Sequence, residues 1–252
     1  MAENKKVIIV ERSNKTVYRE GDVLVKVFAK EHAKSGVFNE AHITSLVESY
    51  GVPAAAVRFV KEIDGGWAIG VDYIEGVTLA EKMKNEPDNF DALLEKFVDI
   101  QVEVSKFKAV GLRNTVDKRA EEINALPDLD PSTRYELLQR LHGMKRHTKL
   151  CHGDFNPSNI ILKEDGSWAV VDWSHATQGN AGADAALTYL ELTLQDPALA
   201  DKYLKLYSKK SDIAIQYIQT WMPIVAAGQL TKAKTDAEKE LLTKWISIAE
   251  YQ

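Results

Sequence analysis

The sequence predicts an α+β chain with a small, mostly antiparallel β N-terminal lobe that contains one helix, followed by a larger, mainly helical C-terminal lobe. Short β-branched runs separated by turn residues fill the first 75 residues, whereas apolar residues recur at helical spacing from Asp91 onward. A chain of 252 residues is long enough to divide into two lobes. We place the first lobe at residues 1–76 and the second at residues 77–252.

Three apolar runs in the N-terminal lobe read as strands, because turn residues bound them. The predicted strands are Val7–Val10, Val23–Phe28 and Trp67–Ile74. Between them, Val37–Tyr50 has apolar residues, Phe38 among them, near helical spacing, and Gly51 follows as a stop signal. One helix is therefore expected among the strands.

The C-terminal lobe is expected to begin with a long helix and to contain one β-hairpin. The apolar face of the helix comprises Leu93, Leu94, Phe97, Ile100, Val104 and Phe107. Further helices are predicted to start near Ser132, at Pro197 behind Asp196, near Asp212, and near Thr235 or Asp236. Asn159–Leu162 and Trp168–Val171 flank an Asp165-Gly166 turn and predict the hairpin.

Composition limits the classes of partner. A net charge of −5 at pH 7 provides no broad cationic field for nucleic acid, so none is expected as a partner. The single cysteine, Cys151, excludes an internal disulfide. No apolar run approaches the length of a membrane span, and the stretch after Met1–Lys6 is too short for a secretory signal. We expect a soluble cytoplasmic protein with no membrane partner, and its oligomeric state stays open.

The strongest chemical signal lies just before and just after the predicted hairpin. Asp154 and Asn159 stand five positions apart in one loop, and the hairpin leads to Asp172. Phosphoryl transfer needs a carboxylate near the acceptor hydroxyl and oxygen ligands for the magnesium ions that bridge the nucleotide phosphates. We expect Asp154 to accept the hydroxyl proton as the catalytic residue, and Asn159 and Asp172 to bind Mg²⁺.

The same residues carry a family resemblance. The text HGD at 152–154 with Asn159, and VDW at 171–173, resembles the aminoglycoside phosphotransferase and choline kinase-like family, which has a protein-kinase-like fold. Gly179 and Asp184 resemble a downstream pair of that family, in which Asp184 is expected to be structural. The resemblance implies a kinase that uses ATP, with GTP left open, and Mg²⁺.

A kinase fold should also place a lysine on a strand and a glutamate on the following helix. Lys26 lies in the run Val23–Phe28, and Glu40 lies in the predicted helix. Read singly, Lys26 would be a solvated strand residue and Glu40 a helix-surface acid. The family order instead favours an ion pair that positions Lys26 against the nucleotide phosphates.

The resemblance implies two further segments that contact the nucleotide. Ser13 and Asn14 fall where the family has its nucleotide-covering loop, although no glycine is present there. The Asp72 carbonyl and the Ile74 amide fall at the inter-lobe hinge, where they would pair with adenine. These four residues complete the expected nucleotide contacts.

Three functions are compatible with a kinase-like fold. The leading one is transfer of the ATP γ-phosphate to a hydroxyl of a small molecule such as an aminoglycoside, an amino alcohol or a sugar. A non-catalytic nucleotide-binding regulatory protein of the same fold is the alternative. A protein kinase is disfavoured because only 11 residues separate Asp172 from Asp184. Trp173, Trp221, Trp245 and Tyr189 could form an aromatic cage for a cationic acceptor, but their apolar surroundings favour a core role.

Overall fold

The computed structural model describes residues 6–247, and it divides into two compact units. The described residues up to Asp88, together with Asn156–His175, form the first unit, and Asn89–Phe155 with the described residues from Ala176 onward form the second. Each unit therefore contains chain segments that are distant in sequence. The division into a nucleotide-binding lobe at 1–76 and a catalytic, acceptor-binding lobe at 77–252 stays a prediction.

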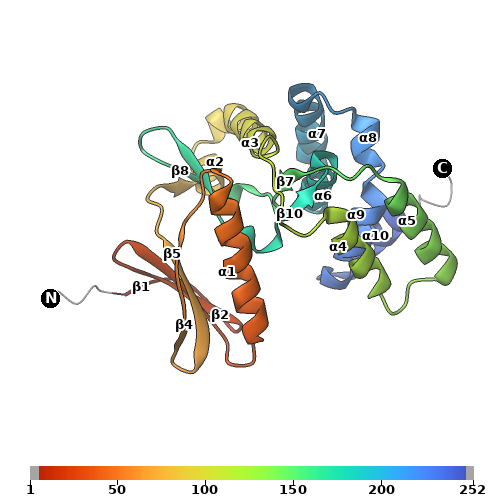
Figure 1. Cartoon of the computed structure of the whole chain (residues 1–252). Helices are drawn as coiled ribbons and strands as arrows, with labels where there is room; N and C mark the ends of the chain where they lie inside the picture. The colour runs from red at the N-terminus through yellow and green to blue at the C-terminus, as the bar shows by residue number, and fades with distance from the viewer. Residues whose placement is uncertain (1–5, 248–252) are drawn as a thin grey trace. The chain divides into compact units, whose positions relative to one another are not determined.

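The first unit is built on a five-stranded antiparallel sheet with the strand order β1-β2-β3-β5-β4. Helix α1, Lys34–Ser49, packs against β4 and β5 (Figure 1). The strands of this sheet are β1 Val7–Arg12, β2 Lys15–Glu20, β3 Val23–Phe28, β4 Val57–Ile63 and β5 Gly66–Asp72. The small β lobe with one helix is thus present, and β3 matches the predicted run from end to end.

The core of this sheet explains which face of α1 is buried. Val37 and Ala41 of α1 pack with Phe28 of β3 and Ile69 of β5. Phe38, one of the apolar residues near helical spacing in α1, lies outside this core and is 45% exposed. Phe38 instead lies beside the Trp67 ring at 5.3 Å, at the rim of the core.

The remainder of the first unit is a second, three-stranded sheet with a short helix. Strands β6 Val77–Thr78, β8 Ile160–Leu162 and β9 Trp168–Val170 form this sheet, and α2 Leu79–Asn85 and the 3₁₀ turns η1 Pro87–Asn89, η2 Pro157–Asn159 and η3 Trp173–His175 complete the set. Strands β8 and β9 pair antiparallel, as predicted for the hairpin. Thr78 begins α2 with a capping box, since its side chain and that of Glu81 each accept a backbone N–H of the other residue.

The second unit is helical, as predicted. Its elements are α3 Phe90–Val104, α4 Thr115–Asn124, α5 Pro131–Gly143, β7 Lys149–Cys151, β10 Thr177–Gly179, α6 Ala181–Gln195, α7 Pro197–Ser211, α8 Ile215–Gln219, α9 Met222–Gln229, η4 Leu230–Lys232 and α10 Asp236–Ser247. Helix α6 is its centre, because every residue from Ala181 to Leu190 is buried and α7, α8 and α9 all pack on it (Figure 1).

The predicted helix ends can be compared with the observed ones. Asp196 caps α7 by accepting from the amides of Ala198 and Leu199, at 3.0 and 3.2 Å, as its position ahead of Pro197 predicted. The helix predicted to start near Asp212 begins at Ile215 as α8, because Asp212 itself adopts a left-handed conformation with φ of 57° that ends α7. Helix α3 ends at Val104, which excludes Phe107 from the predicted helical face.

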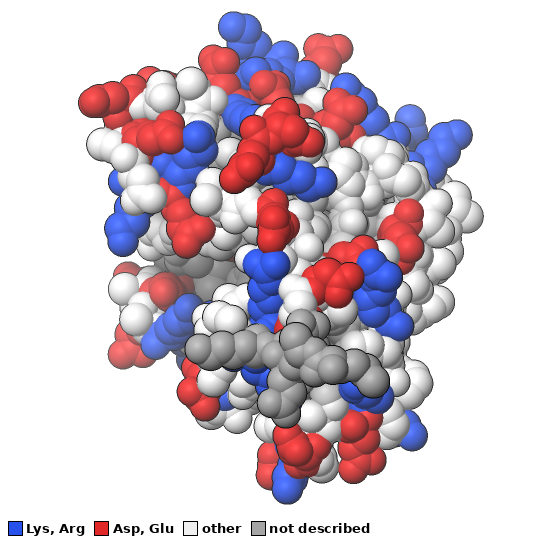
Figure 2. All heavy atoms as spheres, turned by 90° about the vertical axis from the view of Figure 1, so that its left-hand side faces the viewer, with Lys and Arg blue, Asp and Glu red and all other residues white. Residues whose placement is uncertain are grey.

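Among residues 6–247, no helix combines the length and the apolar character needed to cross a membrane. The N-terminal residues 1–5, which belong to the stretch considered for a secretory signal, lie outside the described residues. On the face drawn in Figure 2, acidic and basic side chains are interspersed. The expectation that nucleic acid is not a partner stays a prediction.

Candidate active site

The first unit contains a pocket of about 420 Å³ between its sheet, α1 and the segment that follows β9. Most of the wall is apolar, and ion pairs join three of the charged lining residues, Lys26, Glu40 and Asp172. The lining includes Leu24, Lys26, Glu40, Val71, Asp72, Ile74, Asn159, Ile161 and Asp172. Six of the nine predicted site residues therefore lie around one cavity, although they come from sequence positions as far apart as 26 and 172.

Lys26 is the electrostatic centre of this pocket. Its Nζ donates to Glu40 Oε1 and to Asp172 Oδ1, at 3.0 Å in each case, and its side chain is only 13% exposed. Burial alone would lower the pKa of Lys26, but the charges of Asp172 and Glu40 outweigh burial and raise the pKa above its ordinary value. Lys26 is therefore a fixed cation held by two carboxylates, and the ion pair predicted with Glu40 is present.

Asp172 lies at the end of the hairpin in an unusual backbone conformation. Its φ is 64°, in the left-handed region that aspartate tolerates better than most residues with a Cβ. Trp173, which follows it, is anchored because its indole Nε1 donates to Val170 O at 2.8 Å. Such a conformation costs free energy and persists where the surrounding structure determines it, which is common at functional sites.

The predicted hinge residues also line the pocket. The Asp72 amide donates to Ala56 O at 2.9 Å, and the side chain of Asp72 pairs with Arg58. Within residues 6–247, no group accepts a hydrogen bond from the Ile74 amide. A planar heterocycle in the pocket could use this donor.

Ser13 and Asn14 form the turn between β1 and β2, and neither lines the pocket. The carbonyl of Asn14 accepts from the Ala29 amide at 3.0 Å, which ties the turn to the end of β3. Their phosphate contacts stay a prediction.

The loop with Asp154 belongs to the second unit and is fixed through its backbone. Asp184 of α6 accepts from the amides of His152 and Gly153, at 3.2 and 2.8 Å. The Asp154 amide donates to His152 Nδ1 at 3.2 Å, and His152 is fully buried. Gly153 has φ of 80°, a conformation that favours glycine, so this position needs that residue. Asp184 therefore has the structural role expected of it, and His152 also holds the backbone of this loop.

The sequence analysis did not identify Glu191. It lies seven residues, or two helical turns, after Asp184 on α6, so both residues face the same side of the helix. Burial, followed by the charge of the Asp154 carboxylate, raises the pKa of Glu191 to about 8, while Lys232 acts in the opposite direction. The signal available in the sequence was an acid between two leucines in a mostly apolar stretch of α6.

The aromatic residues considered for a cation cage are mostly core residues. Trp221 is fully buried in the second unit, and Trp173 is buried in the first. Tyr189 is also buried, and its hydroxyl donates to Asp201 at 3.2 Å. These surroundings are those of core aromatic residues.

The sheet with an inward lysine, its glutamate partner on α1 and the aspartate after a β-hairpin are features of protein-kinase-like phosphotransferases. A model of the phosphotransferase enzyme family matches residues 6–217, which is most of the chain. The chain belongs to the phosphotransferase enzyme family. The predicted family and enzyme class, a small-molecule kinase, are thereby confirmed.

Solved structures share this fold at low sequence identity. Aminoglycoside phosphotransferase APH(4)-Ia superposes with a TM-score of 0.71 at 14% identity, over 98% of this chain and 93% of that chain. A streptomycin-ATP-APH(2'')-IIa ternary complex gives a TM-score of 0.64 at 17% identity, over 99% and 92%. ADP-bound APH(2'')-Ib gives 0.64 at 18%, over 99% and 93%. No curated protein sequence matches this chain significantly. The predicted protein-kinase-like fold is confirmed.

Proposed function

We propose that this protein transfers the γ-phosphate of ATP to a hydroxyl of a small molecule that carries a cationic group. The observation that supports this most directly is the Lys26 ammonium, which is held between Glu40 and Asp172 in a largely apolar pocket. A fixed cation of this kind stabilises the α- and β-phosphates of a nucleotide. Three of the structural neighbours are complexes with ATP or ADP, according to their names.

The pocket residues suit a nucleotide in a specific orientation. Leu24, Val71 and Ile161 are apolar wall residues that would cover the adenine faces, and the Ile74 amide would donate to its ring. Lys26 and Asp172 would then face the phosphates. The adenine contact proposed for Ile74 and the phosphate contact proposed for Lys26 thus require the same orientation of ATP in the pocket.

Asn159 and Asp172 fit a magnesium site. Both side chains offer oxygen and line the same pocket, and Mg²⁺ is commonly bound through one or two protein oxygens together with substrate phosphates. Among residues 6–247, no group of three or more His, Cys, Asp or Glu side chains is arranged to hold a metal by itself. Bound there, Mg²⁺ would neutralise charge on the phosphates.

Asp154 would act on the acceptor. A carboxylate held by a fixed loop can orient the acceptor hydroxyl and take its proton, so that catalysis depends on positioning. The Asp184 and His152 contacts fix the loop backbone from residue 152 to residue 154.

Glu191 supports a cationic acceptor. Its carboxyl lies in the field of the Asp154 carboxylate, which adds to burial in raising the pKa of Glu191. Lys232 and Arg119 offset this only in part, because the pKa of Glu191 remains near 8. An ammonium group of the acceptor would compensate the pair, as amino sugars and amino alcohols could do.

The test is magnesium-dependent ADP release over a panel of aminoglycosides, choline, ethanolamine, sugars and homoserine. Wild-type protein is compared with Asp154→Asn, and nucleotide affinity is measured with a fluorescent ATP analogue. Stimulation by a cationic hydroxyl compound, lost in the variant while nucleotide affinity is kept, is the expected result. Normal nucleotide binding without turnover on any acceptor would contradict the proposal and favour the non-catalytic alternative.

A protein kinase function has less support. Only η3 and β10 lie between Asp172 and the start of α6 at Ala181, so no long activation segment is present to dock a peptide.

A further inference from the structure

Three buried polar side chains from three helices of the second unit form a continuous chain of hydrogen bonds. Tyr203 of α7 donates its hydroxyl to Gln101 Oε1 of α3 at 2.6 Å. Gln101 Nε2 donates to Thr188 Oγ1 of α6 at 3.1 Å, and Thr188 donates in turn to the carbonyl oxygen of Phe155 at 3.1 Å. We call these residues, Tyr203, Gln101 and Thr188, the polar relay.

The polar relay is almost fully excluded from solvent. Tyr203 is 0% exposed, and Gln101 and Thr188 are each 2% exposed. Buried polar groups cost free energy unless they are hydrogen-bonded, and apolar residues of similar size could fill such a core without that risk. A satisfied buried network contributes a unique arrangement of the groups that it joins. The last acceptor of the polar relay, the carbonyl of Phe155, therefore indicates which part of the chain the network positions.

The end point is unusual for a threonine inside a helix. Such a hydroxyl ordinarily bonds to the carbonyl four residues earlier in the same helix. Thr193 of α6 does so, because its hydroxyl donates to Tyr189 O at 2.7 Å. Thr188, five residues earlier in the same helix, donates out of the helix to Phe155. Both positions carry threonine, so the different hydrogen-bond acceptors result from the tertiary packing around each residue.

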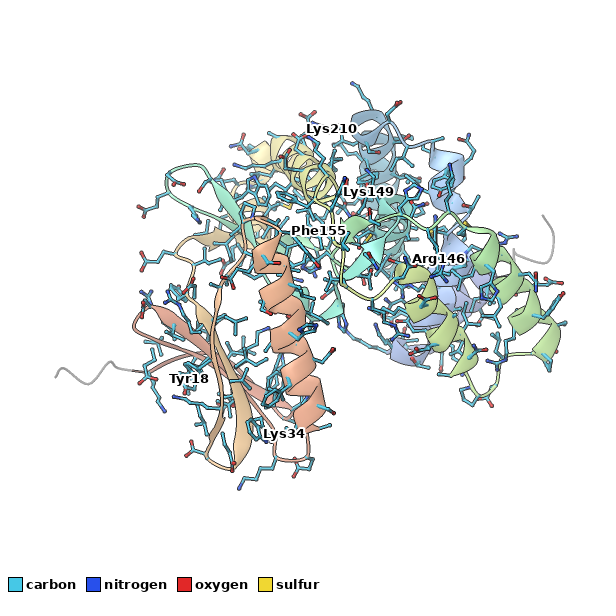
Figure 3. All side chains as sticks on the ribbon, in the orientation of Figure 1. Tyr18, Lys34, Arg146, Lys149, Phe155 and Lys210 are labelled. Carbon is cyan, nitrogen blue, oxygen red and sulfur yellow. The ribbon has the colours of Figure 1, made fainter. Side chains whose placement is uncertain are left out.

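Phe155, labelled in Figure 3, directly follows Asp154 in the chain. Its ring is fully buried against Phe97 of α3, with centroids 5.1 Å apart. The amides on the N-terminal side of Asp154 are held by Asp184, whereas the carbonyl on its C-terminal side is held by Thr188. The two flanks of Asp154 are therefore fixed by one helix, α6, at positions four residues apart.

We propose that the polar relay is a positioning device for Asp154, in which Thr188 fixes the loop and Gln101 and Tyr203 fix the hydroxyl of Thr188. The catalytic part of this inference rests on the function proposed above. Gln101 can serve as the middle link because its amide has both an acceptor oxygen and a donor nitrogen. Loss of any link leaves a buried group without its partner and lets the loop shift. A displacement of about 1 Å at a catalytic group can cost on the order of 100-fold in rate.

The test compares Thr188→Val with Thr193→Val, which is the same substitution in the same helix away from the loop. The first readout is amide hydrogen exchange of the segment 152–156, which needs no substrate. The second is the separation of kcat from the KM for ATP. Thr188→Ser serves as the rescue variant, since it restores the hydroxyl. Tyr203→Phe is compared in the same way with Tyr207→Phe, whose hydroxyl donates at 3.4 Å to Ala181 O.

Thr188→Val is expected to speed exchange at 152–156 and to lower kcat by about tenfold or more, with the KM for ATP changed less than about twofold. Thr188→Ser should restore both readouts, and Thr193→Val and Tyr207→Phe should leave them unchanged. The double variant Thr188→Val/Tyr203→Phe should lose no more than Thr188→Val alone, because the two act in series. Unchanged exchange in Thr188→Val, or equal loss in Thr193→Val, overturns the inference. If the wild type turns over no acceptor, the proposed function fails, and exchange alone still decides the anchoring.

Discussion

Replacing Glu191 by glutamine should stabilise the protein at alkaline pH and leave its stability at acidic pH nearly unchanged. Glu191 is largely buried beside Asp154, and burial raises the pKa of its carboxyl to about 8 from 4.5. Because the folded chain favours the protonated carboxyl, its stability is greatest below pH 4.5 and falls as the pH rises toward 8. Glutamine is a neutral mimic of the protonated form and removes this dependence.

The magnitude follows from the two pKa values. Each pH unit of difference corresponds to about 1.4 kcal/mol, so the interval from 4.5 to about 8 gives about 5 kcal/mol as an upper limit. The carboxyl keeps some contact with solvent, which screens its charge and reduces the effect to roughly 2–4 kcal/mol. We therefore expect Glu191→Gln to raise the free energy of unfolding by that amount at pH 9, by part of it at pH 6.5, and by almost nothing at pH 4.5.

Urea-induced unfolding at these three pH values, followed by tryptophan fluorescence, measures the difference directly. Glu240→Gln is the matched control, because Glu240 is exposed on α10 and its replacement should give a difference near zero at every pH. A Glu191→Gln difference that does not grow between pH 4.5 and pH 9 would refute the reasoning. So would a loss of stability at pH 9, which would mean that the ionised carboxylate makes a favourable contact.

Three further outcomes are expected. Lys26→Met should weaken ATP binding by about tenfold or more and lower kcat, because the cation proposed to face the phosphates is lost; a fluorescent nucleotide titration measures the affinity. Lys118→Met should stabilise the chain by about 1–3 kcal/mol at pH 7 and by little at pH 10.5, since burial lowers the pKa of Lys118 to about 8 and folding then opposes its charge as the pH falls. Gly179→Ala should destabilise by about 1–3 kcal/mol in thermal unfolding, because the added Cβ would lie 1.9 Å from Thr115 Oγ1.

Each of these outcomes has its own control. Lys61→Met, on an exposed strand position outside the pocket lining, should leave nucleotide affinity unchanged. Lys239→Met, on the exposed surface of α10, should show no pH-dependent gain. Gly143→Ala places its Cβ in open space at the end of α5 and should be tolerated. Equal effects in the control and the test variant would contradict the corresponding prediction.

Much of the nucleotide pocket could be predicted from the sequence. Lys26 and Glu40 could be paired because their order along the chain matches the order of a kinase fold, and the structure joins them at 3.0 Å. The contact from Lys26 to Asp172 was not predicted, because the left-handed backbone at Asp172 that aims its carboxylate depends on the hairpin and on the anchored Trp173. The roles assigned to Ser13 and Asn14 rest on order alone and stay predictions.

Elements that depend only on the preferences of a few neighbouring residues could be predicted from the sequence. Proline and aspartate placed the start of α7, the apolar run bounded by turn residues placed β3, and the glycine-containing turn placed the hairpin, since these depend on backbone preferences of a few residues. The exposure of Phe38 depends instead on how α1 packs against the sheet. The end of α7 depends on the left-handed backbone of Asp212, which the spacing of apolar residues does not reveal.

The sequence by itself indicated the class of chemistry, because the text around Asp154, Asn159 and Asp172 resembles the family to which the chain belongs. Only the tertiary structure decided the surroundings of Asp154. Glu191 and Thr188 lie more than 30 positions after it, and their relation to the loop arises because α6 runs beside that loop. Two threonines of one helix have the same side chain, and only the loop packed against α6 gives Thr188 a partner that Thr193 lacks.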